Sequence, residues 1–251
     1  MLHGLNLPVI FPRPHPCAKV RLFCFPYAGG GASIYRTWPA ALPPEVEMGG
    51  VQLPGRESRI REQPLTRMDR LVESLAPALA ACFDRPFVFF GHSMGALVAF
   101  ELARELRRQG LPCPSHLLVS GRVAPQIPVE EPPVFHLPDV QFIDKLRLLG
   151  GMPDEVLDRA ELIELLLPAL RADFALHETY VYVAESPLSC RVTGFAGKND
   201  GNVLYKRLAA WRVQTIDRFN MHILPGNHFF LRSAEKQLLN ILAGEIAWLL
   251  A

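Results

Sequence analysis

The pentapeptide at positions 91–95, GHSMG, constrains the fold of this chain more than any other segment. It matches the pattern G-x-S-x-G, follows an apolar run at 87–90 and precedes a helical pattern at 96–108. A strand that turns sharply into a helix needs glycines where the backbone is crowded, and the turn lifts the serine hydroxyl out of the sheet. The start of the helix favours a developing negative charge. An idle serine in a glycine-rich turn is the alternative, but this context favours Ser93 as a nucleophile.

Apolar runs alternate with helical patterns along most of the chain, which is typical of an α/β fold. The run at 87–90 is fully apolar and is bounded by proline and glycine, as expected for a central parallel strand. We therefore predict a mostly parallel central sheet flanked by helices. The expected strands are 21–26, 46–53, 87–90, 116–120, 191–196 and 219–224, and the expected helices are 68–83, 96–108, 204–212 and 234–250.

The segment from about 124 to 180 interrupts this alternation. It opens with a proline-rich stretch, shows no clear strand, and continues with short apolar helical patterns at 146–149 and 162–170. Long insertions between sheet strands are usually functional, so we expect a helical lid. A helical excursion that only fills out the core is the alternative. We expect residues 1–251 to form a single domain that carries this insertion.

Composition excludes several classes of function. The net charge is +1, which is too small to neutralise a run of phosphates, so nucleic-acid binding is not expected. No apolar run approaches about 18 residues, so we expect no membrane span. Residues 1–20 lack the pattern of a signal peptide, which predicts a cytoplasmic protein. The five cysteines include no CxxC pair and are expected to be free, buried thiols. No cluster has metal-ligand spacing, so no metal is expected.

A serine nucleophile needs a base, and three histidines lie well after Ser93. His228 follows an expected strand and a Pro-Gly-Asn turn, at the edge of the sheet where active sites gather. His222 lies inside that strand and reads as a packed or surface residue, whereas His177 lies in the expected lid. His228 is therefore the predicted base.

The predicted acid is Asp200, which follows the expected strand 191–196. Asp217 is the rival, but it precedes the next strand and should lie at the opposite edge. An aspartate after a strand can also serve only as a turn or helix-capping residue. The chain order Ser93, Asp200, His228 nevertheless matches that of the α/β-hydrolase fold, which we predict here.

An oxyanion hole needs two N–H donors. One should be the residue after the nucleophile, Met94. The other should come from the loop at 25–31, FPYAGGG, where either Tyr27 or Ala28 could donate. This loop lacks the Lys-Ser/Thr end of a phosphate-binding loop, so nucleotide binding is rejected.

The chain contains FPYAGGGAS at 25–33, LPGRE at 53–57 and PGNHFFL at 225–231. Together with three further segments, they resemble a known family, the type II thioesterases of polyketide and nonribosomal peptide synthesis, and the medium-chain thioesterase of fatty-acid synthesis is similar. The resemblance covers more than nine-tenths of the chain. Two departures are Asn227, where relatives most often have glycine, and the end of GKNDGN, where many have Asp-Pro. The segments are FPYAGGGAS (25–33), Trp38, LPGRE (53–57), FFGHSMGAL (89–97), LLPALRADF (166–174) and PGNHFFL (225–231).

The resemblance implies a stand-alone enzyme that hydrolyses acyl thioesters on the phosphopantetheine arm of a carrier protein. The triad would then be Ser93, Asp200 and His228, and Ala28 would be preferred over Tyr27 as the partner of Met94. The resemblance also implies that the enzyme needs no cofactor of its own and acts as a monomer. Release of fatty acyl chains belongs to the same expectation.

Three alternatives stay open at this stage. A carboxylesterase would use the same triad, although FPYAGGG in place of a His-Gly-Gly-Gly loop argues against it. An acyltransferase would differ only in the nucleophile that reaches the acyl-enzyme. A non-catalytic protein that docks to carrier proteins would not need an intact triad. Outside the triad, Arg56 and Glu57 could contact a substrate or carrier, but we expect them to form a structural ion pair. Trp38 is expected to pack rather than to bind a ligand.

Overall fold

The central sheet sets the position of every candidate residue. The structure is a computed structural model that describes residues 7–128, 131–201 and 205–250. In this part of the chain seven strands form one sheet in the order β1-β3-β2-β4-β5-β6-β7, and only the pairing of β1 with β3 is antiparallel. The strands are β1 (Val9–Ile10), β2 (Val20–Phe25), β3 (Val46–Val51), β4 (Phe87–His92), β5 (His116–Ser120), β6 (Arg191–Gly197) and β7 (Phe219–Leu224).

Strand β4 lies in the middle of the sheet, and all six of its residues are buried. This burial on both faces explains why its sequence is a continuous apolar run. Its last residues are in register with the ends of both neighbours, Gly91 with Phe25 of β2 and His92 with Ser120 of β5. The carboxyl ends of these strands therefore meet at one edge of the sheet.

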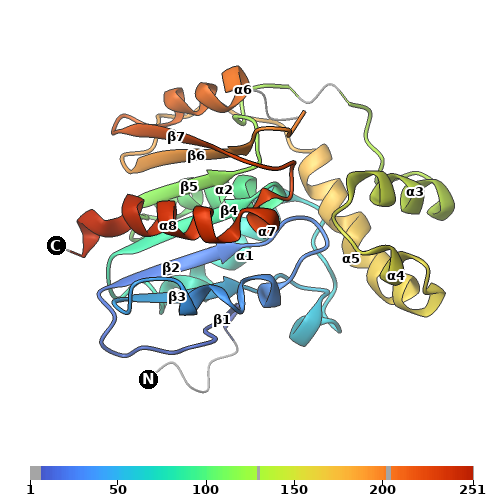
Figure 1. The fold of residues 1–251 in the computed structure, drawn as a ribbon, viewed down its shortest axis with the longest axis horizontal. Helices are drawn as coiled ribbons and strands as arrows, with labels where there is room; N and C mark the ends of the chain where they lie inside the picture. The colour runs from blue at the N-terminus through green and yellow to red at the C-terminus, as the bar shows by residue number, and fades with distance from the viewer. Residues whose placement is uncertain (1–6, 129–130, 202–204, 251) are drawn as a thin grey trace.

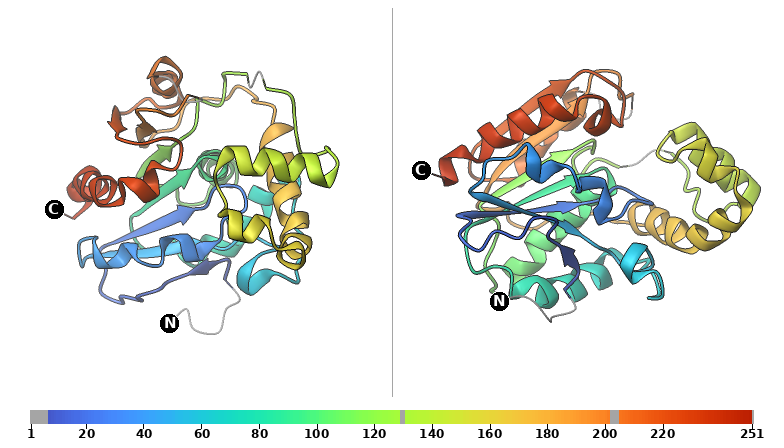
Figure 2. Two further views of the ribbon diagram at one scale, coloured as in Figure 1. Left: turned by 45° about the vertical axis from the view of Figure 1, so that its right-hand side comes forward. Right: turned by 60° about the horizontal axis from the view of Figure 1, so that its bottom comes forward.

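Helices cover the sheet on both faces (Figure 2). One face packs against α1 (Met68–Ala80), α2 (Met94–Arg108) and α6 (Tyr205–Ala209). The other face packs against α8 (Glu235–Ile246) and two 3₁₀ turns, Ala32–Tyr35 and Trp38–Ala40. The two hydrophobic cores that result are the layered arrangement expected of an α/β fold.

The structure confirms the predicted α/β fold class and shifts some boundaries of its elements. Strand β1 was not predicted, because two residues in a proline-rich lead-in carry no strand pattern. Helix α1 ends at Ala80 rather than 83, and the chain continues in tight turns. Of the helix expected at 204–212, position 204 lies outside the described residues, and the rest is α6 followed by a 3₁₀ helix, Ala210–Gln214. The helix expected at 234–250 is α8 (Glu235–Ile246) followed by a 3₁₀ turn, Ala247–Leu249, and the short helix α7 (Phe230–Ser233) before it was not predicted.

The segment expected as a lid folds into three helices, α3 (Asp139–Leu149), α4 (Asp154–Leu157) and α5 (Ala160–Glu178). They lie together at one end of the molecule, on the right in Figure 1. The two short helices expected there are parts of the longer helices α3 and α5. The segment has a hydrophobic cluster of its own. In it the rings of Phe142 and Phe174 pack edge to face, with centroids 5.2 Å apart.

Two expectations about single residue types met different outcomes. Trp38 is 1% exposed and packs against Tyr35 and Phe90, which confirms its predicted packing role. All five cysteines are free, as predicted, but Cys17 and Cys113 are exposed, so the prediction that all are buried was wrong. Both lie in loops next to proline residues. No helix in the described ranges has the length and apolar character needed to cross a membrane.

A buried histidine makes stability depend on pH. His116 is 1% exposed, and its burial lowers its pKa from the ordinary 6.5 to about 4 despite the nearby Glu245 carboxylate. The unfolded chain therefore binds the proton first, and stability falls as pH drops from about 6.5 to about 4. We expect His116→Gln, which can keep the hydrogen bond to Thr193, to remove up to about 3 kcal/mol of this loss. Urea unfolding of wild type and variant at several pH values measures this difference. If the free energy of unfolding depends on pH equally in both proteins, the prediction is wrong.

Candidate active site

The turn between β4 and α2 holds Ser93 in a strained backbone conformation. Its φ is 54° and its ψ is −115°, in a region that side chains rarely adopt. The Ser93 N–H donates to the Ser120 carbonyl of the neighbouring strand at 2.7 Å. A Cβ on Gly91 would lie 2.2 Å from the Gly95 carbonyl oxygen, and one on Gly95 would lie 2.1 Å from that of Phe25. Both glycines are therefore required by close backbone contacts, as the predicted nucleophile turn demands.

Gly95→Ala should damage both stability and activity, because the contact is with rigid backbone. We expect the free energy of unfolding to fall by about 1–3 kcal/mol, the usual cost of overpacking. Activity should also drop, because the turn that carries Ser93 is displaced. The matched control is Gly244→Ala in α8, where nothing lies within 4 Å of the new Cβ. That variant should gain about 0.5–1 kcal/mol, because alanine favours helix. Urea unfolding compares them, and similar midpoints for both would argue against the turn geometry.

His228 and Asp200 face each other across two loops at the carboxyl ends of β7 and β6. His228 Nδ1 lies 2.8 Å from Asp200 Oδ2, and Asp200 is only 5% exposed. Backbone bonds tie the loops together, since the Asn199 N–H donates to the Gly226 carbonyl at 2.9 Å. The side chain of Asn227 accepts from the Phe229 N–H at 3.0 Å and so stabilises the turn that leads into α7. This residue therefore supports the loop in spite of its departure from the usual glycine.

The ring of His228 lies beside the nucleophile turn. Its centroid is 5.1 Å from that of His92, the residue that precedes Ser93. His92 is fully buried and its Nδ1 lies 2.9 Å from Ser120 Oγ. Burial, and next the charge that His228 acquires, hold the pKa of His92 well below its usual range. The His92 ring is therefore neutral and places no charge beside His228.

The two predicted oxyanion donors lie on neighbouring segments. Met94 is the first residue of α2, where backbone N–H groups have no partner inside the helix. Ala28 follows β2 in a turn closed by the Gly30 N–H, which donates to the Tyr27 carbonyl at 2.9 Å. Strands β2 and β4 are adjacent, so both segments lie at the same edge of the sheet. The alternative donor, Tyr27, is buried, and its hydroxyl accepts from Arg232.

The rival residues lie elsewhere. His222 Nε2 lies 2.8 Å from Glu245 of α8, so this histidine joins the sheet to a helix, in agreement with its reading as a packed residue. Asp217 precedes β7 and lies at the opposite end of that strand. His177 lies in α5, as expected. Within the described ranges no group of three or more His, Cys, Asp or Glu side chains could hold a metal ion.

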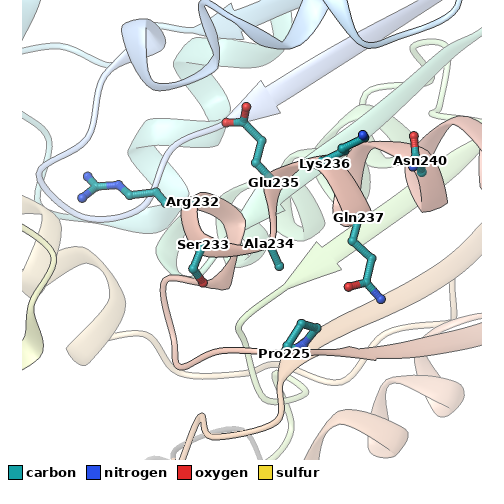
Figure 3. Close-up of a pocket in the computed structure, with 8 residues that line it drawn as sticks. All are labelled: Pro225, Arg232, Ser233, Ala234, Glu235, Lys236, Gln237 and Asn240. Atoms are coloured by element: carbon teal, nitrogen blue, oxygen red, sulfur yellow. The ribbon is translucent and has the colours of Figure 1, made fainter.

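A pocket of about 590 Å³ opens at the start of α8 (Figure 3). It is lined mainly by residues 232–237, together with Pro225 and Asn240. None of Ser93, Asp200 and His228 lines it. It is therefore not the candidate active site.

A family model described as a thioesterase domain matches residues 20–246. The chain belongs to the thioesterase family. The gramicidin S biosynthesis protein GrsT of Aneurinibacillus migulanus is 47% identical over 234 residues, which cover 93% of this chain and 91% of GrsT. The type II thioesterase BorB of the borrelidin biosynthetic cluster is 38% identical, with a TM-score of 0.86 over 94% of this thioesterase and 96% of BorB. YbtT, a type II thioesterase of the yersiniabactin NRPS/PKS pathway, is 30% identical, with a TM-score of 0.86 over 97% and 100%.

These matches confirm the predicted resemblance to type II thioesterases and the α/β-hydrolase fold. Sequence reasoning missed the residues that support the thioesterase site. It assigned no role to His92, although this histidine lies inside the nucleophile motif. It also passed over Asp173 in the LLPALRADF segment and expected Arg56 and Glu57 to share one structural role. In the structure Arg56 forms a buried ion pair with Asp173, whereas Glu57 accepts a hydrogen bond from the Ser33 hydroxyl.

Proposed function

We propose that this thioesterase uses Ser93, Asp200 and His228 to hydrolyse acyl thioesters carried on the phosphopantetheine arm of carrier proteins. Its role would be to remove stalled or aberrant acyl groups in polyketide or nonribosomal peptide synthesis. The observation that carries the proposal is the 2.8 Å contact between His228 and Asp200 beside the strained Ser93 turn. The similarity to YbtT, a thioesterase of an NRPS/PKS pathway, supports the choice of substrate.

The reaction proceeds as acyl transfer in two steps. Asp200 holds the Nδ1 side of His228, so the other ring nitrogen, Nε2, accepts the proton of Ser93. The serine oxygen attacks the thioester carbonyl carbon, and the N–H groups of Ala28 and Met94 stabilise the oxyanion. The C–S bond then breaks, and His228 gives the proton to the leaving thiolate. In the second step His228 takes a proton from water, hydroxide attacks the acyl-serine, and Ser93 recovers its proton as the acid leaves.

The helical segment at 124–180 would serve as the lid of the acyl chamber. The segment has an apolar core of its own, which includes Phe142, Leu170 and Phe174. Ala28 packs against both this cluster and the main core, so the lid reaches the proposed oxyanion hole. The enzyme then needs no cofactor of its own, because the phosphopantetheine belongs to the carrier protein. We still predict that the protein is a monomer and that it is cytoplasmic.

The decisive experiment measures acid release from carrier proteins loaded with acyl groups from acetyl to medium-chain. The same acyl groups are offered as p-nitrophenyl esters and with an alcohol acceptor in parallel. Release from many carriers, at higher kcat/KM than from the esters, would support carrier editing. Release of medium-chain acids alone would favour the fatty-acyl role. Cleavage of the esters with no release from any carrier would favour the carboxylesterase, ester formation with the alcohol the acyltransferase, and binding of carriers without any turnover the docking protein.

A further inference from the structure

A buried carboxylate from the lid binds the loop that carries the proposed oxyanion donor. Asp173 of α5 is 1% exposed, and its Oδ2 accepts from the Gly29 N–H at 2.7 Å. Arg56 is 5% exposed and donates to both carboxylate oxygens, from Nη1 to Oδ2 at 2.6 Å and from Nη2 to Oδ1 at 2.7 Å. Arg56 also donates to the Gly30 carbonyl at 3.3 Å. Three segments far apart in the sequence therefore meet at one carboxylate.

This contact selects the conformation of the loop. The hydrogen bond from the Gly30 N–H to the Tyr27 carbonyl closes a four-residue turn with Ala28 and Gly29 at its centre. The φ of Gly29 is +79°, which identifies a type II turn. In a type I turn the peptide between Ala28 and Gly29 would be rotated by about half a revolution. The Gly29 N–H would then point away from Asp173, so the carboxylate favours the type II form.

The Ala28 N–H belongs to the preceding peptide, and the hydrogen bond that closes the turn sets its direction in either turn type. Because a trans peptide is planar, its N–H points opposite to its carbonyl. The Tyr27 carbonyl points toward Gly30, so the Ala28 N–H of the same peptide points to the other side. The next peptide is held by Asp173. Both peptides that flank Ala28 are thus fixed, one by the turn itself and one by the lid.

Helix α5 also packs directly on the loop. A Cβ added to Gly29 would lie 2.5 Å from Leu170 Cδ2, so the loop lies in close contact with the same helix that supplies Asp173. Leu170 and Asp173 are three residues apart and therefore lie on one face of α5. An apolar contact and a charged hydrogen bond from that face hold Gly29 from one side.

We propose that Asp173, held by Arg56, is a positioning residue that holds the turn at 27–30 in place and so places the Ala28 N–H for the oxyanion. It acts through Gly29 and does not touch the substrate. This inference rests on the proposed function, because it assumes that Ser93 attacks and that Ala28 stabilises the resulting charge. In this arrangement a residue of the lid, Asp173, holds one side of the oxyanion hole in place.

The test is Asp173→Asn, which keeps the size of the side chain and an acceptor for Gly29 but removes the charge that pairs with Arg56. Activity is measured with a short p-nitrophenyl ester, so that carrier binding plays no part. Two inhibitors are titrated against each variant. A trifluoromethyl ketone forms an oxyanion with Ser93, whereas a thioether analogue of acyl-pantetheine has a methylene group in place of the thioester carbonyl.

Glu47→Gln is the matched control. Glu47 is another buried carboxylate, which accepts from Arg21 at 2.7 Å and from the His15 N–H at 2.8 Å. It lies near the start of β3, away from the carboxyl ends of the strands. Its replacement therefore removes the same kinds of contact with no link to the oxyanion loop.

For Asp173→Asn we expect kcat to fall about 10- to 100-fold with little change in KM, as for a displaced oxyanion donor. The inhibition constant of the ketone should rise by the same factor, because it mimics the transition state. That of the thioether should change less than about threefold. Glu47→Gln should lower stability and leave kcat and both inhibition constants near wild type.

An unchanged kcat, or equal weakening of both inhibitors, would overturn the proposal and leave Asp173 a purely structural residue. If Asp173→Asn does not fold, Arg56→Lys replaces it, since lysine keeps the charge but loses the two-pronged contact. Failure of the proposed function would look different. Ser93→Ala would then still cleave the ester, whatever the behaviour of Asp173.

Discussion

Replacing Ser93 with alanine should lower thioester hydrolysis by about 10³- to 10⁶-fold, the range found when a serine nucleophile is removed. The loss is large because no other group on the turn could form the acyl-enzyme. Any activity that remains would come from the oxyanion donors and from substrate binding. Release of acid from an acyl carrier protein, with product measured by mass spectrometry, covers this range.

Two observations complete the Ser93 experiment. The variant should stay folded, because alanine removes only the hydroxyl and keeps the backbone bond to Ser120. Wild type incubated with a fluorophosphonate should gain the mass of one adduct, and the variant should gain none. Ser189→Ala, at an exposed serine, is the control and should behave as wild type. Activity within tenfold of wild type in Ser93→Ala would disprove the nucleophile assignment.

Asp200→Asn should lower kcat by about 10²- to 10⁴-fold, although the side chain keeps its size. The carboxylate accepts from His228 Nδ1, so that Nε2 is left unprotonated and able to take the serine proton. An amide can instead donate to Nδ1, which favours the wrong tautomer, and it no longer stabilises the charged ring. Single-turnover measurement of acylation with a p-nitrophenyl ester isolates this step from product release.

Asp217→Asn is the matched control for Asp200. Asp217 is exposed and lies before β7, at the opposite end of the strand that leads to the His228 loop. We expect its replacement to leave acylation within about twofold of wild type, as for surface changes in general. Equal effects of the two substitutions, or a larger effect of Asp217→Asn, would show that the acid of the triad has been misassigned.

The predicted site depended on local signals that the fold preserves. The strand, the turn and the helix around Ser93 are adjacent in the sequence, so one short motif predicted all three. Asp200 and His228 were found because parallel strands bring their carboxyl ends to one edge of the sheet. Neither step needed knowledge of side-chain packing. The fold class could be predicted for the same reason, since buried central strands such as β4 are apolar throughout.

The supporting contacts could not be predicted in this way. Arg56 and Asp173 are 117 positions apart, and the helix that carries Asp173 lies in a segment without a strand pattern. Nothing local distinguishes this aspartate from those on the surface. The ends of α1 and α8 were missed for a related reason, because tighter turns replace the last residues expected to be helical. Such details depend on tertiary packing rather than on periodicity.

The ion pair between Arg56 and Asp173 has a consequence for engineering. If residues 124–180 form the lid proposed above, exchanging them with those of a relative is a simple route to new acyl preferences. The exchanged segment, however, brings its own residue at position 173 against a fixed arginine. A lid without a carboxylate there would leave a buried cation unpaired and would release Gly29. Chimeras should therefore be chosen so that both partners of the pair come from compatible parents.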